Sequence, residues 1–372
     1  MQRFVMAHGS GRNWPAMRAG CLRQLSGGGG QANVGFLYVT SVLAPHLGEV
    51  LGDLRAATGV AHWIGTVGIG ISCTGREYYE TPALAVLLAS LPDDAFRIIP
   101  GLRAGLEGLA AHGDWYRRHR HHLAILHGDP RNPATPRLIE GLAREVPGAF
   151  CVGGLSSSAS DLCTQIADTL TEGGVSGLLL APQVMVTTGL TQGCSPLGPR
   201  HRITACQFNS IYRLDDRPAV DVLFEDIGEI LSRDPRRIAG YIFAGLPVAE
   251  TDTGDYLVRN LLRLDLRSRH IEIGEYVTAG QSLLFCRRDG NSARDDLLRM
   301  LRDVRRRLPA PPRGGLYVSC LGRGRHLFGE DSQELRLVRA ELGDVPLVGF
   351  FANGEISHNR LYGYTGVLTL FS

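Results

Sequence analysis

The 372-residue sequence contains no lysine, because all 39 of its basic residues are arginine. This absence excludes the mechanisms that depend on a lysine amine, such as Schiff-base chemistry, the lysine-containing phosphate loop and the protein-kinase ion pair. The formal net charge is only +2. A charge this small gives no general electrostatic reason to bind nucleic acid or an anionic membrane. We therefore expect no nucleic-acid partner and no membrane insertion.

Two further signals are missing. The eight cysteines include no Cys-x-x-Cys pair, so the sequence lacks the spacing of zinc ribbons, thioredoxins and iron–sulfur proteins. No run of 18 apolar residues occurs, so no membrane-spanning helix is predicted. Several cysteines lie within apolar stretches, as buried thiols do. These features are typical of a cytoplasmic protein in a reducing compartment.

Signatures of catalysis are weak. The segment Gly153–Ser158 is not the Gly-x-Ser-x-Gly turn of a hydrolase, and Gly65–Gly70 supplies only part of a dinucleotide-binding fingerprint. No pair of acidic residues stands out as a matched acid and base. We therefore predict no enzyme activity and no cofactor. The three histidines of Trp115–His122 could ligate haem or a metal, although the end of a solvated basic helix is the favoured interpretation.

Glycine is abundant, at 47 residues, and it recurs at the same place in a repeated pattern. An apolar strand, an amphipathic helix and a closing apolar strand occur in that order three times. From the first strand to a glycine in the closing strand, Leu37 to Gly65 spans 28 residues, Ile125 to Gly153 spans 28, and Val318 to Gly349 spans 31. This length is that of a β–α–β crossover. The pattern predicts a layered α/β fold with mixed sheets, organised as two related halves.

The expected domains are an N-terminal tail or helix over residues 1–30, a first domain over 31–225 and a second over 226–372. The four glycines of 27–30 suggest a flexible joint. The strongest single helix is predicted over Ala293–Arg307, with Ser292 as its cap. Additional strands are expected at Ser176–Leu180, Val184–Thr188, His201–Ala205, His270–Ile273 and Gln281–Phe285.

Polar residues follow several apolar strands, where ligands of open α/β sheets bind. The candidate ligand-binding residues are Cys194, Arg288, Asp289, Cys320, Gly322, Arg323, Gly324, Asn353 and Glu355. The glycines would expose backbone amides in a tight turn, and an arginine would suit a carboxylate or phosphate. The alternative is that these arginines pair with Asp289, Glu330 or Glu355 and hold the loops in place.

Several motifs carry a family resemblance. Gln192–Pro199 with Arg217–Ala219 resembles the end of a FIST N-terminal domain. Five later segments are similar to parts of a FIST C-terminal domain. They are Tyr256–Leu261, Arg287–Asp289, Ser319–Gly324, Gly349–Ile356 and Tyr364–Phe371. The resemblance covers roughly residues 30–372 in order. The stretches at 262–267 and 267–269 depart from the family pattern.

The resemblance implies a stand-alone sensory module that binds a small ligand, anionic or amino-acid-like, and signals through a partner protein. Two alternatives stay open. Some relatives attach the module to an F-box and recruit proteins, so this chain could be a protein-interaction scaffold. Other members resemble haem-based nitric oxide sensors. A nucleophilic role for Cys194 or Cys320 would need a base that the sequence does not place.

Overall fold

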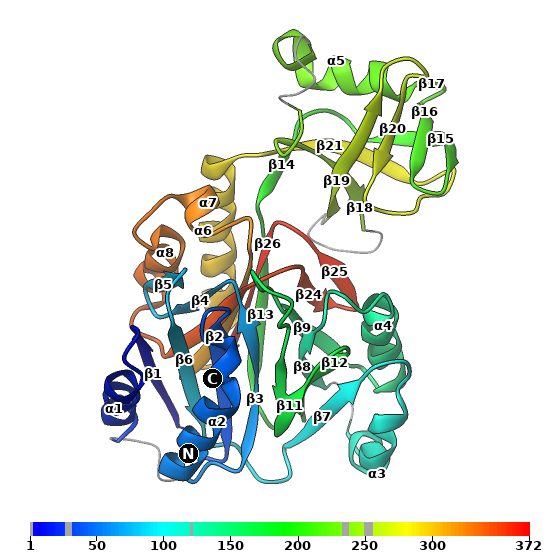
Figure 1. The fold of residues 1–372 in the computed structure, drawn as a ribbon. Coiled ribbons are helices and arrows are strands. Elements are labelled where there is room, and N and C mark those ends of the chain that lie inside the picture. The colour runs from blue at the N-terminus through cyan, green and yellow to red at the C-terminus, as the bar shows by residue number, and fades with distance from the viewer. Residues whose placement is uncertain (1–2, 27–31, 120–121, 233–237, 249–255) are drawn as a thin grey trace. The chain divides into compact units, whose positions relative to one another are not determined.

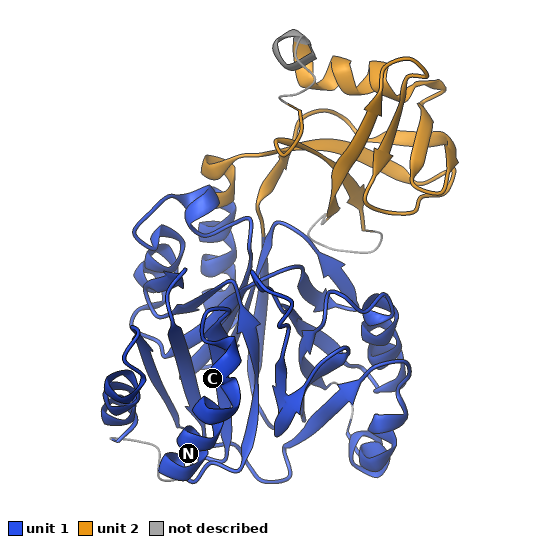
Figure 2. Cartoon of the chain, in the orientation of Figure 1, with its two compact units in different colours: residues 1–191, 294–372 blue, residues 192–293 orange. Residues whose placement is uncertain are grey.

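The computed structural model describes residues 3–26, 32–119, 122–232, 238–248 and 256–372. These residues form two compact units (Figure 2). Unit 1 comprises residues 1–191 and 294–372, and unit 2 comprises residues 192–293. The suggested joint at 27–30 lies outside the described residues. Within the described part of the chain, every helix falls short of the length and hydrophobicity needed to cross a bilayer.

Unit 1 is built from three copies of one chain pattern: outer strand, helix, first strand, helix, closing strand, hairpin and return strand (Figure 1). Repeat 1 contains β1 (Phe4–Ser10), α1 (Trp14–Leu25), β2 (Val34–Thr40), α2 (Leu47–Thr58), β3 (His62–Gly68), β4 (Gly70–Cys73), β5 (Arg76–Tyr79) and β6 (Ala83–Ala89). Repeat 2 contains β7 (Phe96–Leu102), α3 (Gly113–Arg117), β8 (Leu123–Gly128), α4 (Thr135–Glu145), β9 (Phe150–Leu155), β10 (Gln165–Ala167), β11 (Thr169–Thr171) and β12 (Val175–Leu180). The first 30 residues thus contribute a strand as well as a helix.

Repeat 3 is interrupted by unit 2, which lies between its outer strand and its first long helix. Its elements are β13 (Val186–Gln192), α6 (Gly290–Arg307), β22 (Gly314–Cys320), α7 (Arg325–Phe328), α8 (Gln333–Leu342), β23 (Leu347–Ala352), β24 (Glu355–His358), β25 (Arg360–Tyr362) and β26 (Thr365–Phe371). Helix α6 starts three residues before the expected position. The side chain of Asp289, rather than Ser292, accepts hydrogen bonds from the first turn, from the amides of Asn291 and Ser292 at 2.9 and 3.1 Å.

The strands form three six-stranded mixed sheets, one around each repeat. In every sheet the order is outer strand, return strand, first strand, closing strand and then a hairpin. The first and closing strands pair in parallel as β2–β3, β8–β9 and β22–β23, and the remaining ladders given for these sheets are antiparallel. The three predicted strand–helix–strand units and the layered α/β fold class are therefore confirmed. In each unit a closing glycine faces the first strand, in the pairs Leu37–Gly65, Leu126–Gly153 and Tyr317–Gly349.

The hairpins are exchanged between the sheets. The hairpin that follows β3 adds to β23, the one that follows β9 adds to β3, and the one that follows β23 adds to β9. The three repeats thereby contribute to a common apolar core, which includes Phe36 from β2, Ile125 from β8 and Phe350 from β23. This cyclic exchange makes unit 1 a single folding body.

Unit 2 is a small antiparallel barrel with its own core. Its elements are β14 (Cys194–Pro196), β15 (His201–Gln207), β16 (Ser210–Leu214), β17 (Arg217–Pro218), α5 (Ala219–Ser232), β18 (Ile242–Pro247), β19 (Tyr256–Asp265), β20 (His270–Ile273) and β21 (Ser282–Arg288). Strand β21 pairs with both β15 and β18, which closes the ring of strands. Apolar side chains of α5, including Leu223, pack with Ile271 and Phe285 of the strands.

Candidate functional site

The three repeats can be aligned residue by residue, which shows where one of them departs from the others. In repeats 1 and 3 the third residue after the first strand donates its amide to the strand's last residue, as Leu43 N to Thr40 O (2.8 Å) and Arg323 N to Cys320 O (2.8 Å). In repeat 2 the same bond lies one residue further on, from Asn132 N to Asp129 O (3.3 Å). Arg323 therefore occupies the position that buried Leu43 holds in repeat 1. A charged side chain has replaced an apolar one at a core position.

Helix α8 departs in the same way. Both α2 and α8 end at a glycine, Gly59 and Gly343. Counting back nine residues from each glycine places Glu334 at the position of Val50, whose side chain is fully buried. Repeat 3 thus carries both an arginine and a glutamate where repeat 1 packs a leucine and a valine. Because burying charge is costly unless it is paired, such replacements are retained for a reason other than simple packing.

The two charges pair inside the seam between α8 and the sheet. Both side chains are 0% exposed, and Arg323 Nε and Nη2 each lie 2.8 Å from Glu334 Oε1. Tyr317 donates its hydroxyl to the same oxygen at 2.8 Å, and Ser319 donates at 3.1 Å. The amide of Gly324 donates to Glu334 Oε2 at 2.8 Å. The internal partner of Arg323 is therefore Glu334, not the Glu330, Asp289 or Glu355 considered from the sequence.

Gly324 is required by its surroundings. Its φ of 51° lies in the left-handed region, and a Cβ atom there would sit 2.0 Å from the Tyr79 hydroxyl. This close approach brings β5 against the loop after β22. A glycine therefore permits the tight turn here, but its amide is buried and bonded to Glu334, not exposed to a ligand as expected.

Strand β5 supplies a second carboxyl, that of the half-buried Glu77. Tyr79 donates its hydroxyl to Glu77 Oε2 at 2.8 Å, and the amide of Leu335 donates to Glu77 Oε1 at 3.3 Å. Burial, followed by the negative charge of Glu334, raises the pKa of Glu77 to about 7. At the equivalent hairpin positions the other sheets carry Leu170 and Leu361. Glu77 is therefore a third charged residue at a position that is apolar in both other sheets.

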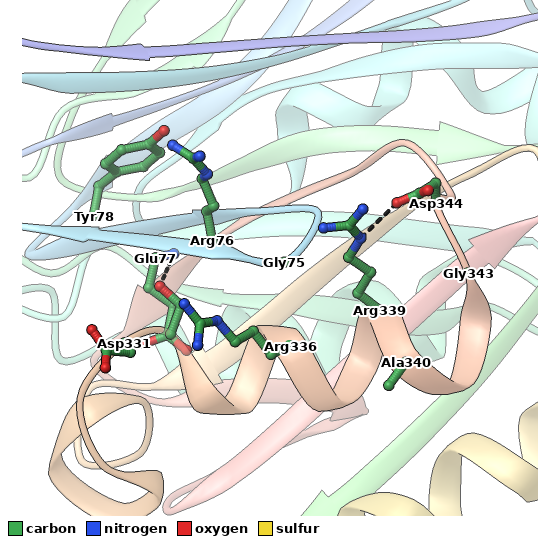
Figure 3. Close-up of a pocket in the computed structure, with 11 residues that line it drawn as sticks. Gly75, Arg76, Glu77, Tyr78, Asp331, Arg336, Arg339, Ala340, Gly343 and Asp344 are labelled. Atoms are coloured by element: carbon green, nitrogen blue, oxygen red, sulfur yellow. Dashed lines mark hydrogen bonds and ion pairs between the residues drawn. The ribbon is translucent and has the colours of Figure 1, made fainter.

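Beside this network lies a hollow of about 690 Å³ between β5 and α8 (Figure 3). Its lining residues are Gly75, Arg76, Glu77, Tyr78, Asp331, Ser332, Arg336, Arg339, Ala340, Gly343 and Asp344. Ser332 Oγ accepts a hydrogen bond from the amide of Glu77 at 2.9 Å, which joins the two walls. Arg339 Nε pairs with Asp344 at 2.6 Å. Within the described residues, the guanidinium of Arg336 has no ion pair or hydrogen bond, so its charge is available to a ligand.

The predicted residues Cys320 and Glu355 also lie in buried surroundings of unit 1. Glu355 is 0% exposed, and its Oε2 accepts from Thr365 N at 3.1 Å and Oγ1 at 2.8 Å. Burial raises the pKa of Glu355 to about 8. Burial also raises the pKa of the Cys320 thiol, which accepts from the amide of Gly322 at 3.5 Å. Leu321 N donates to Ala352 O at 2.9 Å, so the two loops meet as expected.

The remaining predicted residues are placed differently. Asn353 is exposed, and its amide donates to Leu155 O at 3.0 Å. Cys194, Arg288 and Asp289 belong to unit 2, where Cys194 lies opposite Arg288 on neighbouring strands. Asp289 pairs with Arg287 at 3.1 Å besides capping α6. The structure therefore groups six of the nine predicted residues in unit 1 and three in unit 2.

Comparison with known proteins gives two family matches. The model of the FIST N domain matches residues 33–217, and that of the FIST C domain matches residues 219–358. The chain belongs to the FIST family. FIST domains are sensory domains. The FIST boundary at 217–219 falls within unit 2, so the family domains and the compact units divide the chain differently.

The relatives of this FIST protein include mycobacterial proteins. The uncharacterized protein Rv0628c of Mycobacterium tuberculosis is 33% identical over 335 residues, covering 87% of each chain. The uncharacterized protein Mb0898c of Mycobacterium bovis is 32% identical over 322 residues, covering 83% of this chain and 82% of its own. Among solved structures, T. maritima PurL complexed with ADP aligns with a TM-score of 0.24 and 12% identity, covering 100% of this chain and 71% of its own.

Sequence reasoning missed the hollow of this FIST protein. Glu77, Ser332, Glu334 and Arg336 were not singled out. One signal was present, because Glu334 lies four residues before Val338 on the apolar stripe of α8. A carboxylate within a buried stripe indicates a polar partner inside the seam.

The histidines near Trp115 are only partly described. His119 and His122 pack against the Trp115 ring, with centroids 5.7 and 5.3 Å away. No group of three or more His, Cys, Asp or Glu side chains suited to a metal ion occurs in the described part of the FIST chain.

Proposed function

We propose that this FIST protein is a sensory module that binds a small anionic or amino-acid-like ligand in the hollow between β5 and α8. The observation that carries the proposal is the concentration of charge around one sheet, the one that contains β22, β23 and β5. Arg323 and Glu334 stand at positions that are apolar in repeat 1, and Glu77 stands at a position that is apolar in the hairpins of both other sheets. All three lie beside or behind a hollow that is lined by three arginines. Departures from an internal repeat that cost stability are expected where function requires them.

The charges of the hollow suit a ligand that carries both signs. Arg76 and Arg336 both line the hollow, Arg336 on the side between α8 and β5 and Arg76 beside Tyr78 on the other side of β5 (Figure 3), and a guanidinium group matches a carboxylate. Glu77 and Asp331 lie on the same lining and could accept from an ammonium group. Arg339 is already paired with Asp344. A free amino acid with an acidic side chain combines these features, so we take L-glutamate as the first probe.

Replacing Arg336 by alanine is expected to weaken L-glutamate binding about fivefold. An exposed charge-assisted contact contributes about 1 kcal/mol, which corresponds to this factor. Arg76→Ala should have a similar effect, and the double variant should lose about 25-fold. Isothermal titration calorimetry measures these affinities, with glutarate as the comparison ligand that lacks the ammonium group. We expect glutarate to bind more weakly than glutamate.

The repeat offers a matched control. Arg360 follows the two-residue turn of the β24–β25 hairpin just as Arg76 follows that of β4–β5. Arg360→Ala removes the same charge from the equivalent place in another sheet, and it should leave glutamate affinity unchanged. Equal losses in the Arg76 and Arg360 variants, or no measurable binding of any small anion to the wild-type protein, would count against the hollow.

The hollow should also bind simple anions more tightly at lower pH. The pKa of Glu77 is raised by burial to about 7, so its carboxyl is uncharged below pH 7 and negative above it. The negative form repels an anion, so sulfate affinity should rise about three- to tenfold from pH 8 to pH 6. Sulfate keeps its charge over this range. Glu77→Gln should bind with the low-pH affinity throughout, and an unchanged pH profile in that variant would exclude Glu77 as the cause.

The output of such a module would pass to a partner protein. Unit 2 exposes Phe208 and Tyr276, whose side chains are 70% and 75% exposed, and Leu262 lines a shallow groove with Tyr276. Contiguous exposed apolar side chains are typical of protein-interaction sites. All eight cysteines are free thiols, which supports the proposed cytoplasmic location.

A further inference from the structure

Two cysteines meet where the chain enters and leaves unit 2. The chain enters through β14, which pairs directly with β21, the strand by which it leaves. In this antiparallel ladder Cys194 lies opposite Arg288, and Pro196 lies opposite Cys286. Cys194 and Cys286 are therefore diagonal neighbours on one face of the ladder, where side chains of adjacent strands can interact.

The two thiols influence each other. Cys194 is the largest cause of the raised pKa of the Cys286 thiol, and the Cys286 sulfur lies 3.7 Å from the Phe243 carbonyl oxygen. Strand β14 has only three residues and one neighbouring strand, β21. A short edge strand can slide by the small amount that disulfide geometry requires.

We propose that Cys194 and Cys286 form a reversible disulfide in response to hydrogen peroxide, closing a covalent clasp at the base of unit 2. In the first step the Cys194 sulfur attacks one peroxide oxygen, the O–O bond breaks, and a sulfenic acid and water form. In the second step the Cys286 sulfur attacks the sulfenic sulfur, the S–S bond forms and a second water leaves. Two thiols are oxidised and one peroxide is reduced to two waters.

The surroundings assign the order of the two cysteines. Cys194 lies on the edge strand and is 5% exposed, whereas Cys286 is 0% exposed on a strand with neighbours on both sides. The neighbouring Cys194 thiol, and then burial, raise the pKa of the Cys286 thiol, which keeps it protonated until the sulfenic acid forms beside it. Cys194 is therefore the attacking thiol and Cys286 the resolving one. A small dithiol reverses the bond by exchange.

The clasp would act on unit 2 alone. It joins the entering strand to the leaving strand, so the residues between Cys194 and Cys286 become one closed covalent loop. Such a cross-link restricts the unfolded chain and retains the barrel when the ladder between β14 and β21 opens. Oxidation would therefore slow the opening of unit 2 without any change in unit 1.

The test uses the full-length protein treated with a small excess of hydrogen peroxide under native conditions. Free thiols are then alkylated in denaturant and counted by mass spectrometry. The reduced protein should take up eight alkyl groups and the oxidised protein six, that is 8 − 2, with Cys194 and Cys286 joined in one disulfide peptide. A dithiol should restore all eight. Amide hydrogen exchange in β14 and β21 should slow at least tenfold on oxidation.

Two variants complete the test. Cys286→Ser should stop after the first step and leave a sulfenic acid at Cys194 that dimedone traps. Cys320→Ser, which removes a buried thiol of unit 1, should still form the clasp. The proposal is overturned if peroxide leaves both thiols free while the wild-type protein stays folded, if Cys194 pairs with a different cysteine, or if dimedone does not label Cys194 in a folded Cys286→Ser variant.

Discussion

Glu334→Ala is expected to lower the free energy of unfolding by about 3–5 kcal/mol, because it leaves the guanidinium of Arg323 buried without its anion. Both side chains are 0% exposed and 2.8 Å apart. The substitution also removes the acceptor of the Tyr317 hydroxyl, at 2.8 Å. Urea denaturation of the wild type and the variant, both without added ligand, measures the difference. A loss below about 1 kcal/mol would show that the buried pair is not required for folding.

Repeat 1 supplies the matched control for this prediction. Its residues at the equivalent positions are Leu37, Val39, Leu43 and Val50. The combined change Tyr317→Phe, Ser319→Val, Arg323→Leu and Glu334→Val makes the seam apolar without leaving a buried charge or hydroxyl unpaired. It should leave stability unchanged or raise it by about 1–4 kcal/mol, as replacement of buried ion pairs by apolar residues often does.

The same apolar variant separates a structural role of the network from a functional one. Under the proposed function it should fold normally but bind sulfate more weakly at pH 7, because Glu77 loses the charge of Glu334 behind it, its pKa falls and its carboxyl is more often negative. If stability and affinity both stay at the wild-type level, the network serves neither purpose. If stability alone falls, the network holds the loop after β22 in place.

Local sequence pattern was sufficient to find the three strand–helix–strand units. The helix apolar spacing and the closing glycines are properties of adjacent residues, and each crossover is short enough to be read within one segment. At Gly65 a Cβ atom would lie 1.8 Å from the Leu37 carbonyl oxygen, and at Gly349 it would lie 1.7 Å from that of Tyr317. The glycines that mark the spacing are thus fixed by the close approach of paired strands.

The exchange of hairpins and the course of repeat 3 could not be predicted from local pattern. The hairpin β4–β5 pairs with β23, more than 250 residues later, as in Cys73 with Val348. Nothing in the residues of a hairpin states which sheet edge it joins, because every edge offers the same backbone groups. Repeat 3 was also obscured, since about 100 residues separate its outer strand from the helix that follows it.

The candidate site was found only in part for the same reason. Strand ends were identified, so Cys320 and Glu355 were expected to be close, and the loops that carry them do meet. The partner of Arg323 comes from a helix face instead. Its identity depends on the rotation of α8 against the sheet, which places Glu334 inward. Helix rotation follows from packing over the whole seam and not from the loop sequence.

Removal of unit 2 is expected to leave unit 1 folded. The ends that would be rejoined already meet within unit 1, because Thr191 Oγ1 donates to Asp296 Oδ2 at 2.9 Å and Arg307 Nη2 donates to Thr188 O at 2.8 Å. The described apolar clusters also separate, with one cluster entirely in unit 2 and the others entirely in unit 1. A body that retains its whole core and its sheet pairings should fold alone.

The variant replaces residues 192–293 by about five glycine and serine residues, a usual loop length between adjacent elements. Repeat 1 makes the equivalent connection, from β1 to α1, with residues 11–13 only. We expect a single cooperative urea transition, slow hydrogen exchange in β22 and β23, and L-glutamate affinity within about twofold of the full chain. A molten or aggregated product would contradict the insertion of unit 2 into a self-sufficient repeat. A folded product that no longer binds glutamate would instead place the ligand site outside the hollow of unit 1.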